Sequence, residues 1–516
     1  MGLGCCSIRA FYIYVLISIG LLVGSLVIAF SVVPPLIKTL VEENVRLENN
    51  TEQWERFIKL PFSVDFKVYF FEVTNPEEVL TKKKKPILQE KGPYTYKQTR
   101  SKTVISQDDD EDTVTYEEYL DFKFSPEDSV GMDNDSVQVF NTPMLAVIQK
   151  SDELSLIERL ALSSQMGAIF KGQSLIQYFE IKKILFEGLE FAKKQDCKGT
   201  RVCSVVRSRL IKKAKVIKNI KEEDDALKFS FFNYKLNKPD GNLTVKRGLH
   251  DIHSLGNIIK WKNVTDLSIW GNPKSTNNQK CSRVRGTDST LFHPDIESSS
   301  VSEIFSTDLC RAVDINYSGK DSYKGIEGFR FQIDKNTVWF KTNTSEEDCF
   351  CTKQTKNMNN EKDCFLDGIV DMQPCIGSPI LFSLPHFLHA DKKYINTVEG
   401  IDPPVPENFE TFLVVEPNTG VPLKGTKRFQ LNMVLRPQKN FKETKNLITA
   451  VVPLLWIEEG IELPEKYVQE LREIYFDKVK IADIAKYTFI ALTALATCAS
   501  GGFLIYKIRK SKLTEA

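Results

Sequence analysis

The sequence predicts an α+β protein in which a large, strand-rich domain with a helical insertion lies between two membrane-spanning helices. Three observations support this. Two uncharged apolar runs stand near the ends of the chain, at residues 11–33 and 487–506. Between them, apolar residues alternate with polar ones at the spacing of strands. Six of the eleven cysteines lie within residues 281–386, and six is the number needed for three disulfides.

Each apolar run is long enough, as a helix, to cross a hydrocarbon core of about 30 Å. We therefore predict transmembrane helices at residues 11–33 and 487–506. The first run is longer than the roughly 7–15 residues of a signal-peptide core. Pro34 and Pro35 follow it and are expected to end its helix.

Basic residues flank both runs on their outer sides. Arg9 precedes the first, and Lys507, Arg509, Lys510 and Lys512 follow the second. The positive-inside rule then places both tails, residues 1–10 and 507–516, in the cytosol, and residues 34–486 outside it. Cys5 and Cys6 stand just before the first span and are candidates for palmitoylation.

The cysteine-rich region predicts an oxidising setting, either outside the cell or in a lumen. Cys349 and Cys351 flank a single residue, so each is expected to find a distant partner, and six cysteines allow fifteen pairings. A zinc site is disfavoured because no pair has two-residue spacing. Cys197 and Cys203 are close enough for a local bridge, with two free thiols as the alternative.

Six asparagines are N-glycosylation candidates: Asn49, Asn134, Asn242, Asn263, Asn316 and Asn343.

Strand signals dominate most of the chain. Residues 66–73 (FKVYFFEV) are rich in aromatic and β-branched residues, and apolar residues alternate over 114–124. Further strands are expected at KFSFFNY, TVKRGLHD, GFRFQID and TVWFKT. FETFLVVE and KRFQLNMVL flank Pro417-Asn418-Thr419-Gly420 and predict a hairpin. The charged runs 82–85 and 108–112 are interpreted as solvated loops.

Residues 144–194 have the apolar spacing of helices. Leu154, Ile157, Leu160 and Ala161 form one stripe, and Leu175, Phe179 and residues 184–189 continue the pattern. We expect a helical insertion whose stripes face the core, or a helical cap that projects from the sheet. A short amphipathic helix is expected to follow Pro464.

Enzyme motifs are missing from the sequence, which has no nucleophile elbow, zincin motif, phosphate loop or dinucleotide fingerprint. We predict no enzyme activity and no cofactor. The pairs His250/His253 and His386/His389 lie in strand or loop contexts, which disfavours a metal site. Asp288, Asp308 and Asp371 could act together only if the fold joins them. The net charge of +1 gives no reason to expect nucleic-acid binding.

Several strings resemble the CD36-like class B scavenger receptor family over nearly the whole chain. They are GPYTY at 92–96, RGTD at 285–288, STDLCR at 306–311, CFC at 349–351, SLPHFL at 383–388 and PLLWIEEG at 453–460. Within this family the chain is most similar to the insect sensory neuron membrane proteins, by GTDSTLF, IFSTDLCR and the Cys197/Cys203 pair.

The resemblance implies an antiparallel β-barrel ectodomain with a helical cap and an internal tunnel. It also implies the bridges Cys281–Cys349, Cys310–Cys375 and Cys351–Cys364, and it places Lys171 at the ligand entrance. Each methylene withdrawn from water contributes about 0.8 kcal/mol, so a sheltered apolar path would let a long-chain ligand avoid an aqueous gap.

The function that this implies is a plasma-membrane receptor or co-receptor for hydrophobic odorants such as fatty-acid-derived pheromones and other fatty-acyl lipids. Odorant-binding proteins and an odorant receptor complex are the expected partners, and ligands would pass through the tunnel to the receptor. One alternative is a general scavenger receptor for lipids, lipoprotein or apoptotic debris. Another is an adhesion or structural protein with a closed cavity.

Overall fold

The structure, a computed structural model, describes residues 8–270, 279–299, 302–333, 350–352 and 355–514. The chain divides into two compact units. One combines residues 1–46 with 463–516, and the other is residues 47–462. We describe each by itself.

The first unit is made of long helices. α1 (Ile8–Val27), a π-helical turn η1 (Ile28–Val32) and α2 (Val33–Val45) follow one another without a break. The prediction that Pro34 and Pro35 end the helix is therefore wrong. Both prolines stand in the first turn of α2, directly after η1, and the π-helical turn lies where their missing N–H groups would otherwise have donated.

The second long helix, α14 (Asp477–Thr514), follows α13 (Glu465–Leu471) and the π-helical turn η10 (Arg472–Phe476). It packs against α1 through small polar side chains. The Ser18 and Ser500 hydroxyls lie 2.9 Å apart, and those of Ser25 and Thr493 lie 3.1 Å apart. Large apolar side chains on both helices are exposed, and both helices are long and apolar enough to cross a membrane.

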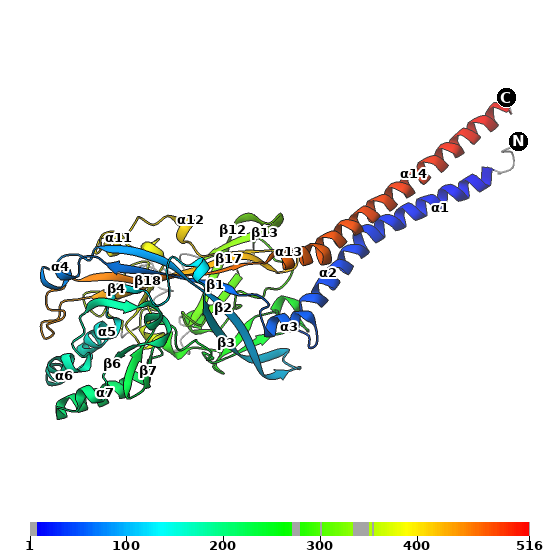
Figure 1. The fold of residues 1–516 in the computed structure, drawn as a ribbon. Helices are drawn as coiled ribbons and strands as arrows, with labels where there is room; N and C mark the ends of the chain where they lie inside the picture. Colours follow the sequence, from blue (N-terminus) through cyan, green and yellow to red (C-terminus); the bar gives the residue numbers. More distant parts are fainter. Residues whose placement is uncertain (1–7, 271–278, 300–301, 334–349, 353–354, 515–516) are drawn as a thin grey trace. The chain divides into compact units, whose positions relative to one another are not determined.

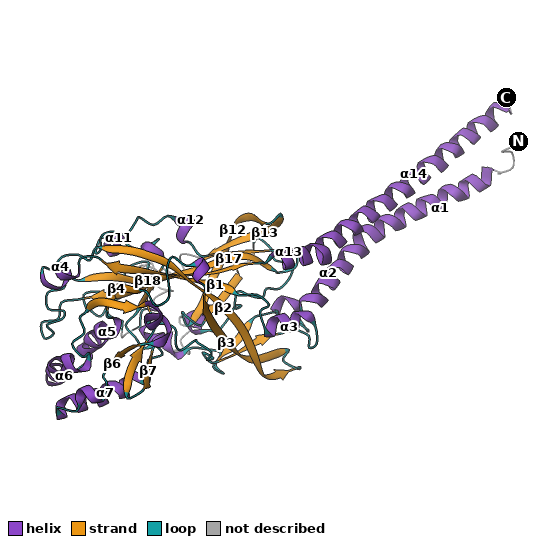
Figure 2. Ribbon diagram, viewed as in Figure 1, coloured by secondary structure: helices purple, strands orange, loops and turns teal. Residues whose placement is uncertain are grey.

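The second unit is built around one large antiparallel sheet (Figures 1 and 2). Eleven strands follow one another across it: β10 (Ile258–Trp261), β9 (Asn242–Lys246), β3 (Thr113–Phe124), β2 (Leu88–Asp108), β1 (Val64–Val73), β18 (Ala450–Glu462), β17 (Pro422–Leu435), β16 (Phe412–Val415), β13 (Ile326–Ile333), β12 (Arg311–Tyr323) and β11 (Ser302–Ser306). The short strands β14 (Val370–Asp371) and β15 (Leu381–Ser383) attach to β17.

A two-residue segment, Gly286-Thr287, bridges the two edges of this sheet. The Ile258 N–H on β10 donates to the Gly286 carbonyl at 2.7 Å. On the other side, the Thr287 N–H donates to the Glu303 carbonyl at 2.9 Å, and the Phe305 N–H donates to the Thr287 carbonyl at 2.8 Å. Because Glu303 and Phe305 belong to β11, the sheet is nearly closed into a barrel.

The strand predictions are confirmed where alternation is strong. Residues 66–73 fall in β1, residues 114–124 in β3, and the predicted hairpin is formed by β16 and β17. KFSFFNY contributes only its first residues to a strand, β8 (Ala226–Phe229). TVWFKT lies outside the described residues.

The insertion is helical only in part. It contains α5 (Thr142–Lys150) and α6 (Leu156–Ile169), and α6 begins with a capping box between Ser155 and Glu158. The helix predicted from Leu175 onward is wrong. That segment forms β5 (Ile176–Glu180), a π-helical turn η4 (Lys183–Glu187) and β6 (Leu189–Phe191), because β5 pairs with β4 (Ser136–Phe140) and β6 pairs with β8.

The apolar stripe predicted over residues 154–161 faces the core only in part, through Leu154 and Ala161. Ile157 and Leu160 are exposed, whereas Leu162, Met166 and Ile169 are buried. A helix that the sequence analysis missed, α7 (Arg201–Ala214), lies beside α6, and Arg209 forms an ion pair with Glu158. Figure 2 shows α5, α6 and α7 grouped together beside the sheet.

The acidic run 108–112 is not a wholly solvated loop. Asp112 is buried and accepts backbone hydrogen bonds from Leu249 at 2.8 Å and His250 at 3.0 Å. Its carboxylate also lies 3.4 Å from the guanidinium of the buried Arg247. Burial of a carboxylate requires such partners, and Arg247 supplies the positive charge.

Candidate functional site

A cavity of about 240 Å³ lies inside the β unit. Its walls come from strands on both halves of the barrel and from the segments that lead into β11 and β15. Two chemically distinct surfaces line it, one apolar and one charged. Residues close to both sequence ends of the unit, Leu60, Val64 and Ile461, also line the cavity.

The apolar wall comes from neighbouring strands in register. Phe331 on β13 lies opposite Leu413 on β16, and Ile333 lies opposite Ile315 on β12. Val313 on the same strand is paired with Ile304 on β11. All six side chains line the cavity, so three strand pairings place branched and aromatic groups on one continuous surface.

Ten charged side chains line the cavity among the described residues. Five of them are joined by ion pairs, and we call them the charged set: Arg100, Lys235, Asp308, Lys427 and Glu459. Lys427 Nζ lies 2.5 Å from Asp308 Oδ2 and 3.5 Å from Glu459 Oε2. Arg100 Nη2 lies 2.5 Å from Glu459 Oε1, and Lys235 contacts Asp308. Three cations and two anions leave the set with a net charge of +1.

The charged set is ionised because its members compensate one another. Burial by itself would raise the pKa of Glu459, but Arg100 and then Lys427 outweigh it and lower the pKa to about 2. Burial opposes ionisation of Asp308 in the same way, and Lys235 and Lys427 hold its pKa well below the ordinary value. The pKa of Lys235 is raised, since Asp308 more than offsets its burial.

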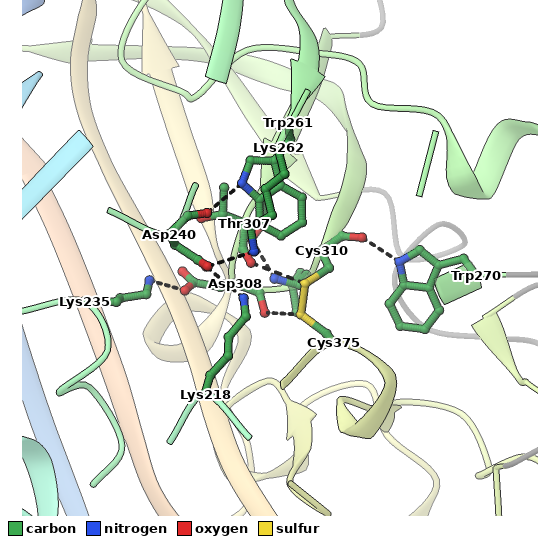
Figure 3. The surroundings of a disulfide bond; sticks show 12 residues. Lys218, Lys235, Asp240, Trp261, Lys262, Trp270, Thr307, Asp308, Cys310 and Cys375 are labelled. Atoms are coloured by element: carbon green, nitrogen blue, oxygen red, sulfur yellow. Dashed lines mark hydrogen bonds and ion pairs between the residues drawn. A yellow bond between two sulfur atoms is a disulfide. The ribbon is translucent and has the colours of Figure 1, made fainter. Parts of the chain in front are cut away.

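A disulfide fixes the backbone next to Asp308. Cys310, two residues later, is bonded to Cys375, and its carbonyl accepts a hydrogen bond of 2.5 Å from the buried Trp270 indole (Figure 3). Figure 3 also shows a second charged group beside it, in which Asp240 lies 2.9 Å from Lys218 and 3.1 Å from Lys262. Asp240 lines the cavity as well.

Asp288, in the segment that closes the barrel, lines the cavity near Lys102. Lys102 Nζ lies 3.1 Å from Asp288 Oδ2 and 4.0 Å from the centroid of the Phe57 ring. Burial of Asp288 opposes its ionisation, but Lys102 and the Thr290 hydroxyl lower its pKa below the ordinary value. The structure therefore brings Asp288 and Asp308 to one cavity, whereas Asp371 is not among the lining residues.

Three disulfides are formed by described cysteines: Cys197–Cys203, Cys310–Cys375 and Cys351–Cys364. The predicted partner of the buried Cys281, Cys349, lies outside the described residues, as do Cys5 and Cys6.

The predicted glycosylation sites stand at different depths. Asn49, Asn134, Asn263 and Asn316 are exposed, and Asn242 is half-buried. The side-chain amide of Asn242 donates to that of Asn263 at 2.6 Å, so these two sites face each other. Asn343 lies outside the described residues.

Lys171 follows the end of α6, where its backbone has a φ of 48° and its side chain is exposed. The cavity lining includes neither Lys171 nor any other residue of 144–194. The histidines of the second pair each contact a carboxylate: His386 Nε2 lies 2.7 Å from Glu90, and His389 Nε2 lies 3.0 Å from Glu410. Within the described part of the chain, no group of three or more His, Cys, Asp and Glu side chains is arranged to hold a metal ion.

Comparison with known proteins identifies the family. The model of the CD36 family matches residues 15–504, nearly the whole chain. This chain belongs to the CD36 family. Sensory neuron membrane protein 2 of Anopheles gambiae is 29% identical, over 92% of this chain and 89% of that protein. The protein of the same name from Manduca sexta is 30% identical over 92% and 90%. Sensory neuron membrane protein 1 of Apis mellifera is 29% identical over 94% and 89%.

Membership of the CD36 family confirms the resemblance and supports a receptor-type role at a membrane. The charged set escaped sequence reasoning because its members stand far apart, on β2, β17, β18 and two connecting segments. Only Asp308 of this set was among the candidate carboxylates named from the sequence, and one local signal marks it. It lies within STDLCR, two residues from a cysteine expected to be bonded.

Proposed function

We propose that this CD36-family chain is a plasma-membrane receptor or co-receptor that binds hydrophobic odorants, such as fatty-acid-derived pheromones, and transfers them to an odorant receptor. Both tails would be cytosolic, and the β unit would face outward. The names of the relatives support a sensory role. The observation that carries the proposal is the cavity inside the barrel, whose apolar wall suits an acyl chain.

The physical argument concerns the cost of exposing a long apolar ligand to water. A cavity of about 240 Å³ with Phe331, Leu413 and Ile315 on one side shields methylenes, each worth about 0.8 kcal/mol. The charged set on the other side gives the cavity a polar end, and this would orient a ligand that has one polar group. No covalent step is required.

A blocking substitution tests the proposal. Leu120 on β3 lines the cavity and is half-buried, so Leu120→Trp would occupy the space. Lys123→Trp, on an exposed position of the same strand, is the matched control. In cells that express an odorant receptor responsive to hexadecyl acetate, we expect the chain to enhance the response, Leu120→Trp to abolish the enhancement, and Lys123→Trp to preserve it. An undiminished response with Leu120→Trp at equal surface expression would refute transfer through the cavity.

The same cells separate this function from general scavenging. A scavenger receptor would take up labelled lipoprotein without changing the response of the odorant receptor. Enhanced odorant responses without lipoprotein uptake support the proposal, and the reverse result favours the scavenger alternative.

A further inference from the structure

Six aromatic side chains gather inside the β unit next to the charged set, and we call them the aromatic cluster: Phe66, Tyr96, Phe122, Phe124, Phe186 and Phe232. Neighbouring ring centroids in the cluster lie 5.1–6.3 Å apart, most of them in edge or tilted contacts. Such contacts are favourable for aromatic rings and equally accept an acyl chain between them.

The register of the sheet joins the cluster to the cavity. Phe66 on β1 lies directly opposite Glu459 on β18, which belongs to the charged set. On its other side Phe66 lies opposite Tyr96 on β2, and Tyr96 lies opposite Phe124 on β3. Along β3, Leu120 lines the cavity, and Phe122 is the next residue on the same face. The cluster therefore continues the cavity wall.

The Tyr96 hydroxyl is the polar atom inside this cluster. Tyr96 is 3% exposed, and its Oη has no hydrogen-bond partner among the described residues. A buried hydroxyl without a partner is costly, so native proteins nearly always supply one. Burial raises the pKa of Tyr96, and Asp133 and Glu187 raise it further. The hydroxyl therefore stays protonated and is a donor at neutral pH.

Two rings of the cluster are less enclosed than the other four. Phe122 and Phe124 face inward but are half-buried rather than fully buried. Phe186 packs on both Tyr96 and Phe122 and stands in the π-helical turn η4. Its backbone carbonyl accepts a hydrogen bond of 2.7 Å from the side-chain amide of Asn233. The Tyr96 hydroxyl itself is fully enclosed, so a ligand oxygen reaches it only when the neighbouring rings of Phe124 and Phe186 turn aside.

None of the six rings lines the cavity itself, which ends beside them at Leu120. We propose that the aromatic cluster is a ligand subsite adjoining the cavity, in which the Tyr96 hydroxyl donates a hydrogen bond to the oxygen of an ester, aldehyde or alcohol. The rings pack on the adjoining methylenes. The inference rests on the proposed function, since it assumes that apolar ligands enter the cavity, and it adds which group of the ligand is recognised.

Tyr96→Phe is the direct test, because it removes one oxygen and leaves the ring in place. Tyr94→Phe is the matched control, as Tyr94 is a second buried tyrosine two residues away on β2. The full chain in detergent is titrated with tritiated hexadecyl acetate and with tritiated octadecane, which has no oxygen. We expect Tyr96→Phe to weaken acetate binding roughly 3- to 10-fold, the range of one hydrogen bond, and to leave octadecane binding unchanged. Tyr94→Phe should change neither.

A thermal unfolding scan without ligand accompanies the titration. If the hydroxyl is unpartnered in the free protein, Tyr96→Phe unfolds at the same or a higher temperature than the wild type. Equal acetate affinity in Tyr96→Phe and wild type overturns the subsite while leaving the proposed function intact. Equal losses for both probes with a lowered unfolding temperature also overturn it, because the hydroxyl would then be structural. A wild type that binds neither probe overturns the proposed function and the subsite together.

Discussion

Arg100 on β2 lies 2.5 Å from Glu459 on β18, and this ion pair connects two barrel strands that are separated by β1. Through Lys427 the pair continues to Asp308, whose backbone is fixed by the Cys310–Cys375 bridge. The charged set therefore has a structural role as well as a role in the cavity. Removing Asp308 would leave the buried Lys235 charged without its ion-pair partner.

The first prediction concerns Asp308, the carboxylate shared by Lys235 and Lys427. Asp308→Asn should lower the free energy of unfolding by about 3 kcal/mol, because the buried Lys235 loses its counter-ion and Lys427 keeps only Glu459, at 3.5 Å. The measurement is thermal unfolding of the purified chain. Lys320→Gln is the control, since Lys320 and Glu327 are 68% and 83% exposed and such a pair contributes at most about 1 kcal/mol. Equal small shifts for both variants would contradict this role.

The second prediction is a pH dependence. Glu459 has an ordinary pKa of 4.5 and a folded-state pKa of about 2. Because the folded pKa is lowered, its contribution to stability is present above pH 4.5 and is lost as the pH falls towards 2. Between about pH 5 and pH 3, the range that this linkage sets, the unfolding temperature of the wild type should therefore fall more steeply than that of Glu459→Gln. Parallel curves of unfolding temperature against pH for the two proteins would contradict this role of Glu459.

The third prediction concerns barrel closure. Gly286 has a φ of 92°, and a Cβ atom there would lie 2.6 Å from the Glu303 carbonyl. Gly286→Ala should destabilise the chain by more than about 1 kcal/mol, because the backbone conformation and the space both reject the methyl group. Gly167→Ala, inside α6 with open space around it, should be neutral or stabilising by about 0.5–1 kcal/mol. Thermal unfolding of both variants is the measurement. An unchanged unfolding temperature in Gly286→Ala would show that the Gly286-Thr287 closure of the barrel is not needed for stability.

The fourth prediction compares two disulfides. Cys310 and Cys375 are 65 residues apart, and Cys351 and Cys364 are 13 apart. Loop-closure entropy predicts losses of about 4 and about 3 kcal/mol when each pair is replaced by serine. Loss of the first pair also releases the segment that holds Asp308. We therefore expect the larger drop in unfolding temperature for the Cys310/Cys375 double variant; the opposite order would show that loop length does not govern these bridges.

Elements whose signals lie within one segment could be predicted from the sequence, whereas elements that depend on pairing with distant segments could not. β3 and the β16–β17 hairpin could be predicted, because alternation and turn residues are contained within each segment. The segment from Leu175 to Phe191 could not, since its apolar spacing fits a helix and its strands exist through pairing with β4 and β8. The buried face predicted for α6 was wrong in part, for a similar reason. Which apolar residues are buried depends on what packs against the helix, and Ile157 meets nothing that covers it.

The candidate site was the least predictable part. Family resemblance implied a tunnel and an entrance lysine, but not the charged set or the aromatic cluster. Their members become neighbours only through strand register, as Phe66 and Glu459 do across β1 and β18. No spacing within the chain signals such a pair.

The central claim is that an apolar ligand occupies the barrel cavity. Photo-crosslinking the full chain with a diazirine-bearing analogue of hexadecyl acetate, followed by mapping of the labelled residues by mass spectrometry, tests it directly. The account predicts labels on β12, β13 and β16, at residues such as Ile315, Phe331 and Leu413, and a loss of these labels in Leu120→Trp. Labels confined to the exposed face of α6 or to α1 and α14, with none on the cavity walls, would contradict it.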